Sequence, residues 1–290
     1  MEPLIITSND PMIPPGPNQI AETIDAAVAA AEAGATILHH HLIYNPPNIR
    51  GGEPVLDVDA SIAIIEGIRK RSNAIIQLGI TSATNESRMA VAKGANVDMF
   101  SMTICDNDHY FDNFPFPSVH RDRTEMVMLA DFCLDNNIRP EFEVFHTGAV
   151  WNLHYLIKEG KVRPPYWINL CMYTEGSCWS PRTEREVDYR SSLLPEGSKW
   201  HLVAFTHANG APTYVFPPPT PERHTQLMAH AILMGGHVRM GREDRPEIAT
   251  GRPAKSNAEL IAMIKQIAES LGRPVATPAE ARRMLDIAQK

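Results

Sequence analysis

Short apolar and β-branched runs alternate along this chain with longer stretches in which apolar residues recur at helical spacing. This alternation is typical of βα units that build a parallel sheet. Eight runs are predicted strands: Leu4–Thr7, Thr36–Leu42, Ala74–Gly79, Val97–Met102, Glu141–Phe145, Trp167–Met172, Leu202–Phe205 and His237–Gly241. Eight strands with no interrupting linker indicate a closed (β/α)₈ TIM barrel.

Predicted helices fill the intervals between these strands. They cover Pro17–Ala33, Val58–Lys70, Glu86–Ala92, Arg123–Asn136, Trp151–Glu159, Thr183–Tyr189, Pro221–Leu233 and Asn257–Leu271. A further helical pattern at Pro278–Ala288 is extra to the eight βα units, so we expect a TIM barrel with an additional C-terminal helix. The chain has 290 residues and 43% hydrophobic content, which predicts a single barrel domain over residues 1–290.

Charge and apolar-segment length argue against two classes of partner. The formal net charge is −7 and no block of Lys or Arg is present, which argues against electrostatic binding of nucleic acid or of an anionic membrane. No apolar run approaches the roughly 20 residues of a membrane span, and the segment Met1–Asp10 lacks the pattern of a signal peptide. We therefore expect a cytoplasmic protein that binds a small molecule.

Three consecutive histidines end the second predicted strand, within the run Ala35–Leu42. Because side chains alternate between the two faces of a strand, His39 and His41 share one face. The other face carries mainly apolar residues and His40, which suits packing against outer helices. We predict that His39 and His41 point inward at the mouth of the barrel, where two imidazoles form half of a metal site. Hydrogen-bonded core or rim histidines are the alternative.

A second group of polar residues lies in the eighth predicted strand, which begins directly after Gly235-Gly236. The residues that share one face of this strand are His237, Arg239, Gly241 and Glu243. The guanidinium of Arg239 can hold a carboxylate through two hydrogen bonds, and Glu243 can supply a third metal ligand. Asp244, at the end of the strand, is free to act as a base.

The three candidate ligands can meet at the mouth of a closed barrel. Strands two and eight are separated there by strand one alone, so His39, His41 and Glu243 can converge at the opening. A set of two imidazoles and one carboxylate with open positions suits catalytic zinc, and it also suits non-haem iron. The ligand types leave the choice of metal open.

Five segments carry a resemblance to a known family. They are Glu32–His41, Pro140–Phe145, Gly235–Asp244, Ser256–Leu260 and Val275–Arg282. Together they resemble the β-keto acid cleavage enzymes over essentially the whole chain, and the combination of His-x-His with Arg-x-Gly-x-Glu-Asp is specific. The resemblance implies a (β/α)₈ barrel that holds one zinc ion, Zn²⁺, with His39, His41 and Glu243.

That family exchanges a β-keto acid and acetyl-CoA for acetoacetate and a new acyl-CoA, and it commonly forms tetramers. The resemblance therefore implies a homotetrameric transferase in which Asp244 and Arg239 take part in catalysis. The residue chemistry agrees, because Asp244 can take a proton and Arg239 can steady negative charge beside a metal-polarised ketone. Glu143, in the fifth strand, is a further candidate catalytic residue, and Thr103, just past the fourth strand, is a candidate substrate contact.

Two departures from the family pattern lie near the candidate site. Gly79 stands where the third strand of the family ends in serine, and Thr81 or Ser82 is a candidate to bind substrate in its place. Asp10 is one methylene shorter than the family's glutamate. The acid of the aminohexanoate enzyme matches an ammonium group, so we expect Asp10 to bind the distal end of the substrate and to favour a cationic or hydroxyl-bearing tail. Capping the proline-rich loop after strand one is its alternative role.

Two other functions are compatible with these residues. The altered turn after the third strand favours a zinc lyase or hydrolase that acts on a keto acid without CoA, and a non-catalytic binder would keep the same fold and metal. No glycine-rich phosphate loop marks a CoA site. The candidates for CoA phosphates are the basic residues Arg121, Arg123, Arg242 and Arg245, with solvated surface charge as the alternative.

Overall fold

The computed structural model describes residues 1–14, 16–41, 57–79, 84–106, 122–173, 179–206 and 220–289, and the strands β5 (Tyr110–Phe111) and β6 (Phe114–Pro115). All eight predicted strands are confirmed. They are β1 (Ile6–Ser8), β2 (Ile37–His40), β3 (Ile75–Leu78), β4 (Met99–Thr103), β7 (Arg139–Val144), β8 (Tyr166–Tyr173), β10 (Ser198–Ala204) and β11 (His237–Met240).

These strands form one parallel sheet in the order β10-β11-β1-β2-β3-β4-β7-β8. Strand β10 also pairs with β8, from Ser198 opposite Tyr166 to Ala204 opposite Met172. This pairing closes the sheet, so the fold is the predicted barrel. Because β11, β1 and β2 are neighbours, the strand ends that carry the candidate ligands lie side by side.

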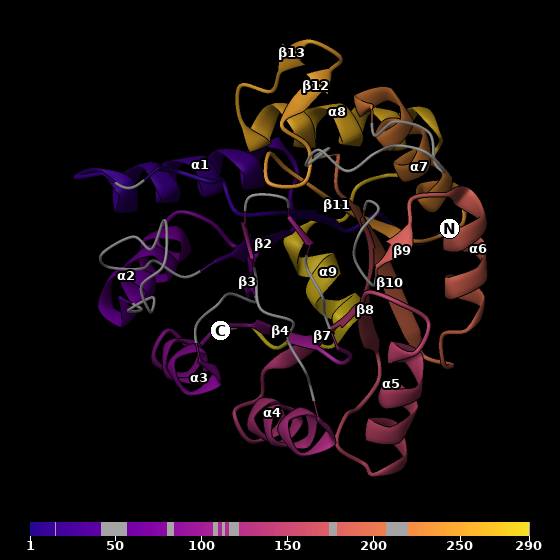
Figure 1. The fold of residues 1–290 in the computed structure, drawn as a ribbon. Helices are drawn as coiled ribbons and strands as arrows, with labels where there is room; N and C mark the ends of the chain where they lie inside the picture. Colours follow the sequence, from indigo (N-terminus) through magenta and orange to yellow (C-terminus); the bar gives the residue numbers. More distant parts are fainter. Residues whose placement is uncertain are drawn as a thin grey trace.

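The predicted helices are confirmed and surround the barrel (Figure 1). They are α1 (Gln19–Ala33), α2 (Val58–Arg69), α3 (Asn85–Gly94), α4 (Arg123–Asp135), α5 (Ala149–Lys158), α6 (Glu184–Ser192), α7 (Pro221–Leu233) and α8 (Asn257–Ser270). Most begin at a Ser, Thr or Asp whose side chain accepts a hydrogen bond from the backbone N–H three residues later, as Asp122 does from Glu125. Three further features were not predicted from the sequence: the strands β5 and β6, the short strand β9 (Ser180–Pro181), and the hairpin of β12 (Glu247–Ala249) and β13 (Arg252–Pro253).

The additional C-terminal helix, α9 (Pro278–Leu285), closes one end of the barrel, and Figure 1 shows it across the ring of strands. Its buried residues pack with inward-facing apolar side chains, namely Ile5, Ile37, Ile75, Met99 and Trp167. An ion pair between Arg282 and Asp98, with 2.9 Å between Nη1 and Oδ1, fixes the helix there. The opposite end, where the carboxyl ends of the strands lie, is the end at which a TIM barrel places its binding site.

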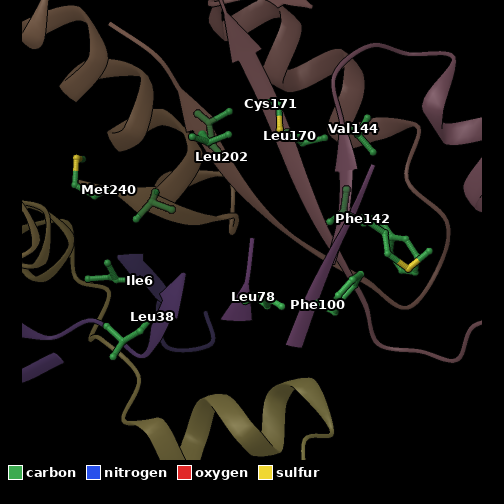
Figure 2. Packing of buried hydrophobic residues seen from close by; sticks show 14 of the residues in the cluster. Ile6, Leu38, Leu78, Phe100, Phe142, Val144, Leu170, Cys171, Leu202 and Met240 are labelled. Atoms are coloured by element: carbon green, nitrogen blue, oxygen red, sulfur yellow. The ribbon is translucent and has the colours of Figure 1, made fainter. Parts of the chain in front are cut away.

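Alternate residues of each strand face two different environments. Those that point outward form the apolar core under the helices, and Figure 2 shows Ile6, Leu38, Phe100 and Leu202 among them. Those that point inward above the floor are mostly polar. No helix in the described part of the chain is long and apolar enough to cross a membrane.

Candidate active site

The structure brings the three predicted metal ligands together at the mouth of the barrel. His39 is 1% exposed near the end of β2, and its ring lies edge-on to that of His41, with 5.0 Å between centroids. Glu243, in the turn after β11, reaches the same point, and its Oε1 lies 2.9 Å from His41 Nε2. One donor atom from each of the three residues lies within 4.8 Å of the others, so the predicted convergence is confirmed.

The charges around these residues favour cation binding. Burial, with Arg239 and His41 nearby, holds the pKa of His39 well below its ordinary value, so its imidazole is neutral, as a metal ligand must be. Burial alone would lower the pKa of His41, but the Glu243 carboxylate outweighs it and raises that pKa to about 9. The His41 and Arg239 charges in turn keep the pKa of Glu243 low despite burial. Glu243 is therefore ionised, and a metal ion can replace the proton that it shares with His41.

Arg239 organises both acidic residues of the motif. Its Nε and Nη2 donate to the two carboxylate oxygens of Asp244 at 3.1 and 2.9 Å, and Nη2 also donates to Glu243 Oε2 at 2.9 Å. Asp244 is completely buried, and this burial raises its pKa to about 6 even though Arg239 opposes the shift. Asp244, which the sequence analysis treats as free to act as a base, is bound by the neighbouring guanidinium, and its role as the base stays a prediction.

Gly241 of the same motif gives room to a polar neighbour. A side-chain carbon at Gly241 would lie 1.6 Å from Asn9 Oδ1, so only glycine admits the Asn9 amide at this level. Asn257, the first residue of α8, donates to the Asn9 backbone oxygen at 2.8 Å and accepts from the N–H of Arg242 at 2.9 Å. Asn9 was not predicted as a site residue, although its partner Asn257 lies in a segment of the family resemblance.

Glu143 and Thr103 also lie at the barrel mouth, on the neighbouring strands β7 and β4 where they pair in register. Thr103 Oγ1 lies 3.4 Å from Glu143 Oε2, and both side chains are buried. Burial, together with the nearby charge of Glu141, raises the pKa of Glu143 to about 7. A carboxyl group with that pKa can accept or donate a proton near neutral pH.

Asp10 lies just after β1, and its side chain accepts a hydrogen bond from the backbone at the end of β2. Its Oδ1 accepts from the backbone N–H of Met12 at 2.8 Å, and its Oδ2 accepts from the N–H of His41 at 3.1 Å. The side chain is 16% exposed. Asp10 therefore supports the turn after β1 while part of its carboxylate faces outward. The predicted substrate contact Ser82 and its neighbour Thr81 lie outside the described residues.

A buried polar network below the ligands was not predicted. Ser101 Oγ donates to Glu141 Oε2 at 2.7 Å, and His201 Nε2 lies 2.6 Å from Glu141 Oε1. The His201 ring stacks on Trp167 at the barrel floor, with 4.7 Å between centroids. Burial would raise the pKa of Glu141, but His201 lowers it to about 2. The Glu141 carboxylate is therefore ionised and interacts electrostatically with His39.

One candidate for CoA binding was wrong. Arg245 is 1% exposed, and it donates to Thr225 Oγ1 and to the backbone oxygen of Ile248, both at 2.6 Å, so its role is structural. Arg123 is exposed and lies over the ring of Tyr155, with 4.4 Å from its Cζ to the centroid. Arg121 lies outside the described residues.

Comparison with known proteins agrees with this arrangement. A family model described as "beta-keto acid cleavage enzyme" matches residues 6–287. The chain belongs to the β-keto acid cleavage enzymes. This member is 28% identical to a 3-keto-5-aminohexanoate cleavage enzyme of Acetoanaerobium sticklandii over an alignment that covers 100% of both chains. It is 27% identical to a 3-dehydrocarnitine:acetyl-CoA trimethylamine transferase of Rhizobium meliloti, over 96% of this chain and 91% of that protein.

A solved structure of much lower sequence identity shares the fold of this β-keto acid cleavage enzyme. The apo structure of ObcA superposes with a TM-score of 0.70 at 16% identity and covers 92% of this chain. The chain spans 64% of the length of that ObcA chain. At this level of identity the likeness supports the barrel fold and nothing further.

Proposed function

We propose that this member of the family is a zinc-dependent transferase that condenses a β-keto acid with acetyl-CoA to give acetoacetate and a new acyl-CoA. The observation that carries the proposal is the meeting of His39, His41 and Glu243 beside the Arg239–Asp244 pair at the barrel mouth. In the net reaction the acyl group of the keto acid moves to the CoA sulfur. The acetyl group of acetyl-CoA takes its place on the carbon next to the carboxylate.

The donor set fits the proposed zinc ion. Two ligands of a tetrahedral zinc with bonds of about 2.0–2.1 Å lie roughly 3.3 Å apart, and His41 Nε2 and Glu243 Oε1 are already 2.9 Å apart. Bound there by His39, His41 and Glu243, zinc would supply a Lewis acid able to polarise a ketone oxygen. Two neutral imidazoles and one carboxylate leave a net positive centre, which favours an anionic substrate.

The chain's own groups supply the proton transfer and the charge stabilisation. We propose that Asp244 takes the proton, since burial has already made it a stronger base than an exposed aspartate. Arg239 holds Asp244 and Glu243 in place. Its Nη1 lies 3.4 Å from His39 Nε2, beside the proposed metal ligands, where negative charge would develop on the substrate. Glu143 and Thr103, across the barrel mouth from Asp244, would contact the substrates.

The name of one relative supports the second substrate of the proposed reaction. The Rhizobium meliloti relative is named as an acetyl-CoA transferase, which supports acetyl-CoA as the second substrate. We further propose a homotetrameric, cytoplasmic enzyme whose single domain covers residues 1–290. Size-exclusion chromatography with light scattering measures the subunit number.

A screen of β-keto acids with and without acetyl-CoA, read by mass spectrometry, tests the function. We expect acetoacetate and a matching acyl-CoA to appear in equal amounts only when acetyl-CoA is present. Products formed without acetyl-CoA would instead identify a lyase or hydrolase. No turnover with any β-keto acid would identify a binding protein.

Asp10→Asn tests the proposal that Asp10 binds the substrate tail. A hydrogen bond to a charged group contributes about 1.5–3 kcal/mol, so kcat/KM should fall at least about tenfold more for a substrate with an ammonium tail than for a neutral one of equal length. The Acetoanaerobium relative is named for a substrate with an amino group, which supports an ammonium-bearing tail. The variant also weakens the turn at Met12 and His41. An equal loss on both substrates would therefore assign Asp10 to that turn.

A further inference from the structure

Asn169, in the middle of β8, carries an amide group that no protein group in the described part of the chain binds. Its neighbours Ile168 and Leu170 belong to the apolar core under the helices, so Asn169 points into the barrel. The residue is completely buried, and neither Nδ2 nor Oδ1 has a hydrogen-bond partner among the described residues. Because an unpaired buried amide is costly and an apolar side chain would avoid that cost, the amide indicates a ligand.

Asn169 lies at the level of the proposed metal ligands. Side chains inside a TIM barrel stack in layers, and each layer takes its residues from alternate strands. The registers of the parallel pairs, followed around the barrel, place one residue each of β2, β4, β8 and β11 in the same layer, namely His39, Ser101, Asn169 and Arg239. In the strand order β8 is as far from β2 as the barrel allows, so Asn169 faces His39 across the interior.

Two polar side chains flank Asn169 in register, Glu143 on β7 and His201 on β10. Glu143 lies at the barrel mouth beside Thr103, whereas His201 lies deeper, with its Nε2 2.6 Å from Glu141 Oε1. An ionised glutamate offers only acceptors. Among the described side chains of this wall, Asn169 therefore supplies N–H groups that are both unused and level with the ligands.

The proposed reaction develops negative charge that such N–H groups can stabilise. The keto acid would lie beside the residues of β2 and β11, and acetyl-CoA would approach it from the facing wall of β7 and β8. The carbon deprotonated by Asp244 bonds to the acetyl carbonyl carbon, and the C=O π electrons move onto the oxygen. They return as the C–S bond breaks and CoA leaves as a thiolate. The thiolate then takes the original acyl group, and the released carbanion takes back the proton from Asp244.

We propose that Asn169 is a further catalytic residue, which donates from its amide to the carbonyl oxygen of the acetyl thioester as negative charge develops there. Side-chain amides serve as donors of this kind in acyl transfer. The proposal rests on the proposed function, since it takes acetyl-CoA as the second substrate. Asn169 was predicted as part of a strand, with no role in the site.

Asn169→Leu and Asn169→Ala test the proposal, the first with an apolar side chain of similar shape and the second with added room. Loss of one such donor typically lowers kcat about 10²- to 10³-fold, and we expect a loss in that range in both variants, with the zinc content of the wild type. An unpaired amide can be replaced by an apolar group without loss of stability, so the Tm of Asn169→Leu should stay near that of the wild type.

Asn136→Leu is the matched control, because the Asn136 amide donates to the backbone oxygen of Phe132 at the end of α4, outside the barrel interior. It should keep the kcat of the wild type. Wild-type kcat in either Asn169 variant would mean that the amide binds water only, and it would overturn the proposal. Failure of both Asn169 variants to fold would overturn it as well, by assigning the amide to the fold.

Proton exchange separates a catalytic donor from a structural residue. Removal of a proton from the keto acid by Asp244 needs no acetyl-CoA, so it is followed in D₂O by NMR, as deuterium uptake above the uncatalysed rate at the carbon next to the carboxylate. We expect both Asn169 variants to exchange at the wild-type rate while acetyl transfer falls. Equal losses of exchange and transfer would assign Asn169 a structural role and overturn the proposal.

The wild type separates this proposal from the function on which it rests. If the wild type forms acetoacetate only with acetyl-CoA and the Asn169 variants do so equally well, Asn169 has no catalytic role and the proposed function stands. If the wild type does not use acetyl-CoA, the proposed function is wrong and the role of Asn169 is overturned with it. If the wild type transfers the acetyl group without prior exchange, the step assigned to Asp244 is wrong, and kcat and Tm decide the role of Asn169.

Discussion

Asp244→Asn is expected to keep the metal and to lower kcat by about 10²- to 10⁴-fold, the contribution that a positioned general base typically makes. Asp244 is fully buried and accepts from Arg239 with both carboxylate oxygens. An asparagine presents one oxygen and one N–H₂ group, so it keeps one of these bonds and cannot take a proton. Glu243 retains its own bond from Arg239, and the zinc content should therefore be unchanged.

Two measurements separate loss of the base from loss of the fold. Removing one partner of a buried ion pair costs roughly 3–5 kcal/mol, so Tm and zinc content are measured beside the kinetics at saturating keto acid. Asp131→Asn is the control, since it changes the same groups at a half-exposed ion pair with Lys161, and it should leave kcat unchanged. A near-normal kcat in Asp244→Asn would make Asp244 a structural neighbour of the ligand, and Glu143→Gln would be tested next.

The barrel was predictable because each strand and helix has its own pattern of apolar residues in the sequence. Eight strand-like runs and the helical stretches between them each show their own periodicity, and a cap or glycine marks most helix ends. The largest boundary difference is at β10, which begins at Ser198, before the predicted Leu202. The residues before Leu202 include Lys199 and Trp200, so apolar patterning alone did not reveal the start of the strand.

The metal ligands were predictable from alternation combined with topology. Period two places His39 and His41 on one face and His40 on the other, and barrel closure places β11 beside β1 and β2. No further information was needed to bring Glu243 to the two histidines. The hydrogen bonds from Arg239 to Asp244 were not predicted, because a strand pattern shows which face a residue occupies and does not show which side chain binds it.

The remaining features depend on contacts between strands that are far apart in sequence. The Glu141–His201 pair crosses the barrel interior from β7 to β10, and neither residue stands in a recognisable motif with the other. The approach of Gly241 to Asn9 is a matter of shape. A glycine in a sequence can indicate a close contact at that position, but the side chain that makes the contact is known only once the strands are placed.

Replacing His39 or His41 with alanine is expected to remove both the metal and the activity. The purified wild type should carry about one zinc per chain, because two imidazoles and one carboxylate form one catalytic site. Each alanine leaves at most two protein ligands, and in His41→Ala the Glu243 carboxylate also loses its 2.9 Å partner. The zinc content of each variant, measured by elemental analysis, and its turnover should therefore fall together.

His40→Ala is the matched control for these two variants, since it removes an imidazole from the same run but from the opposite face of β2. His40 is 3% exposed, and its Nδ1 lies 3.9 Å from Asp10 Oδ2. Its loss should lower Tm through the cavity that it leaves, while the zinc content stays near one per chain. Loss of zinc in His40→Ala with retention in His39→Ala would reverse the assigned faces of β2. Full zinc in the double variant His39→Ala/His41→Ala would show that the metal is held elsewhere.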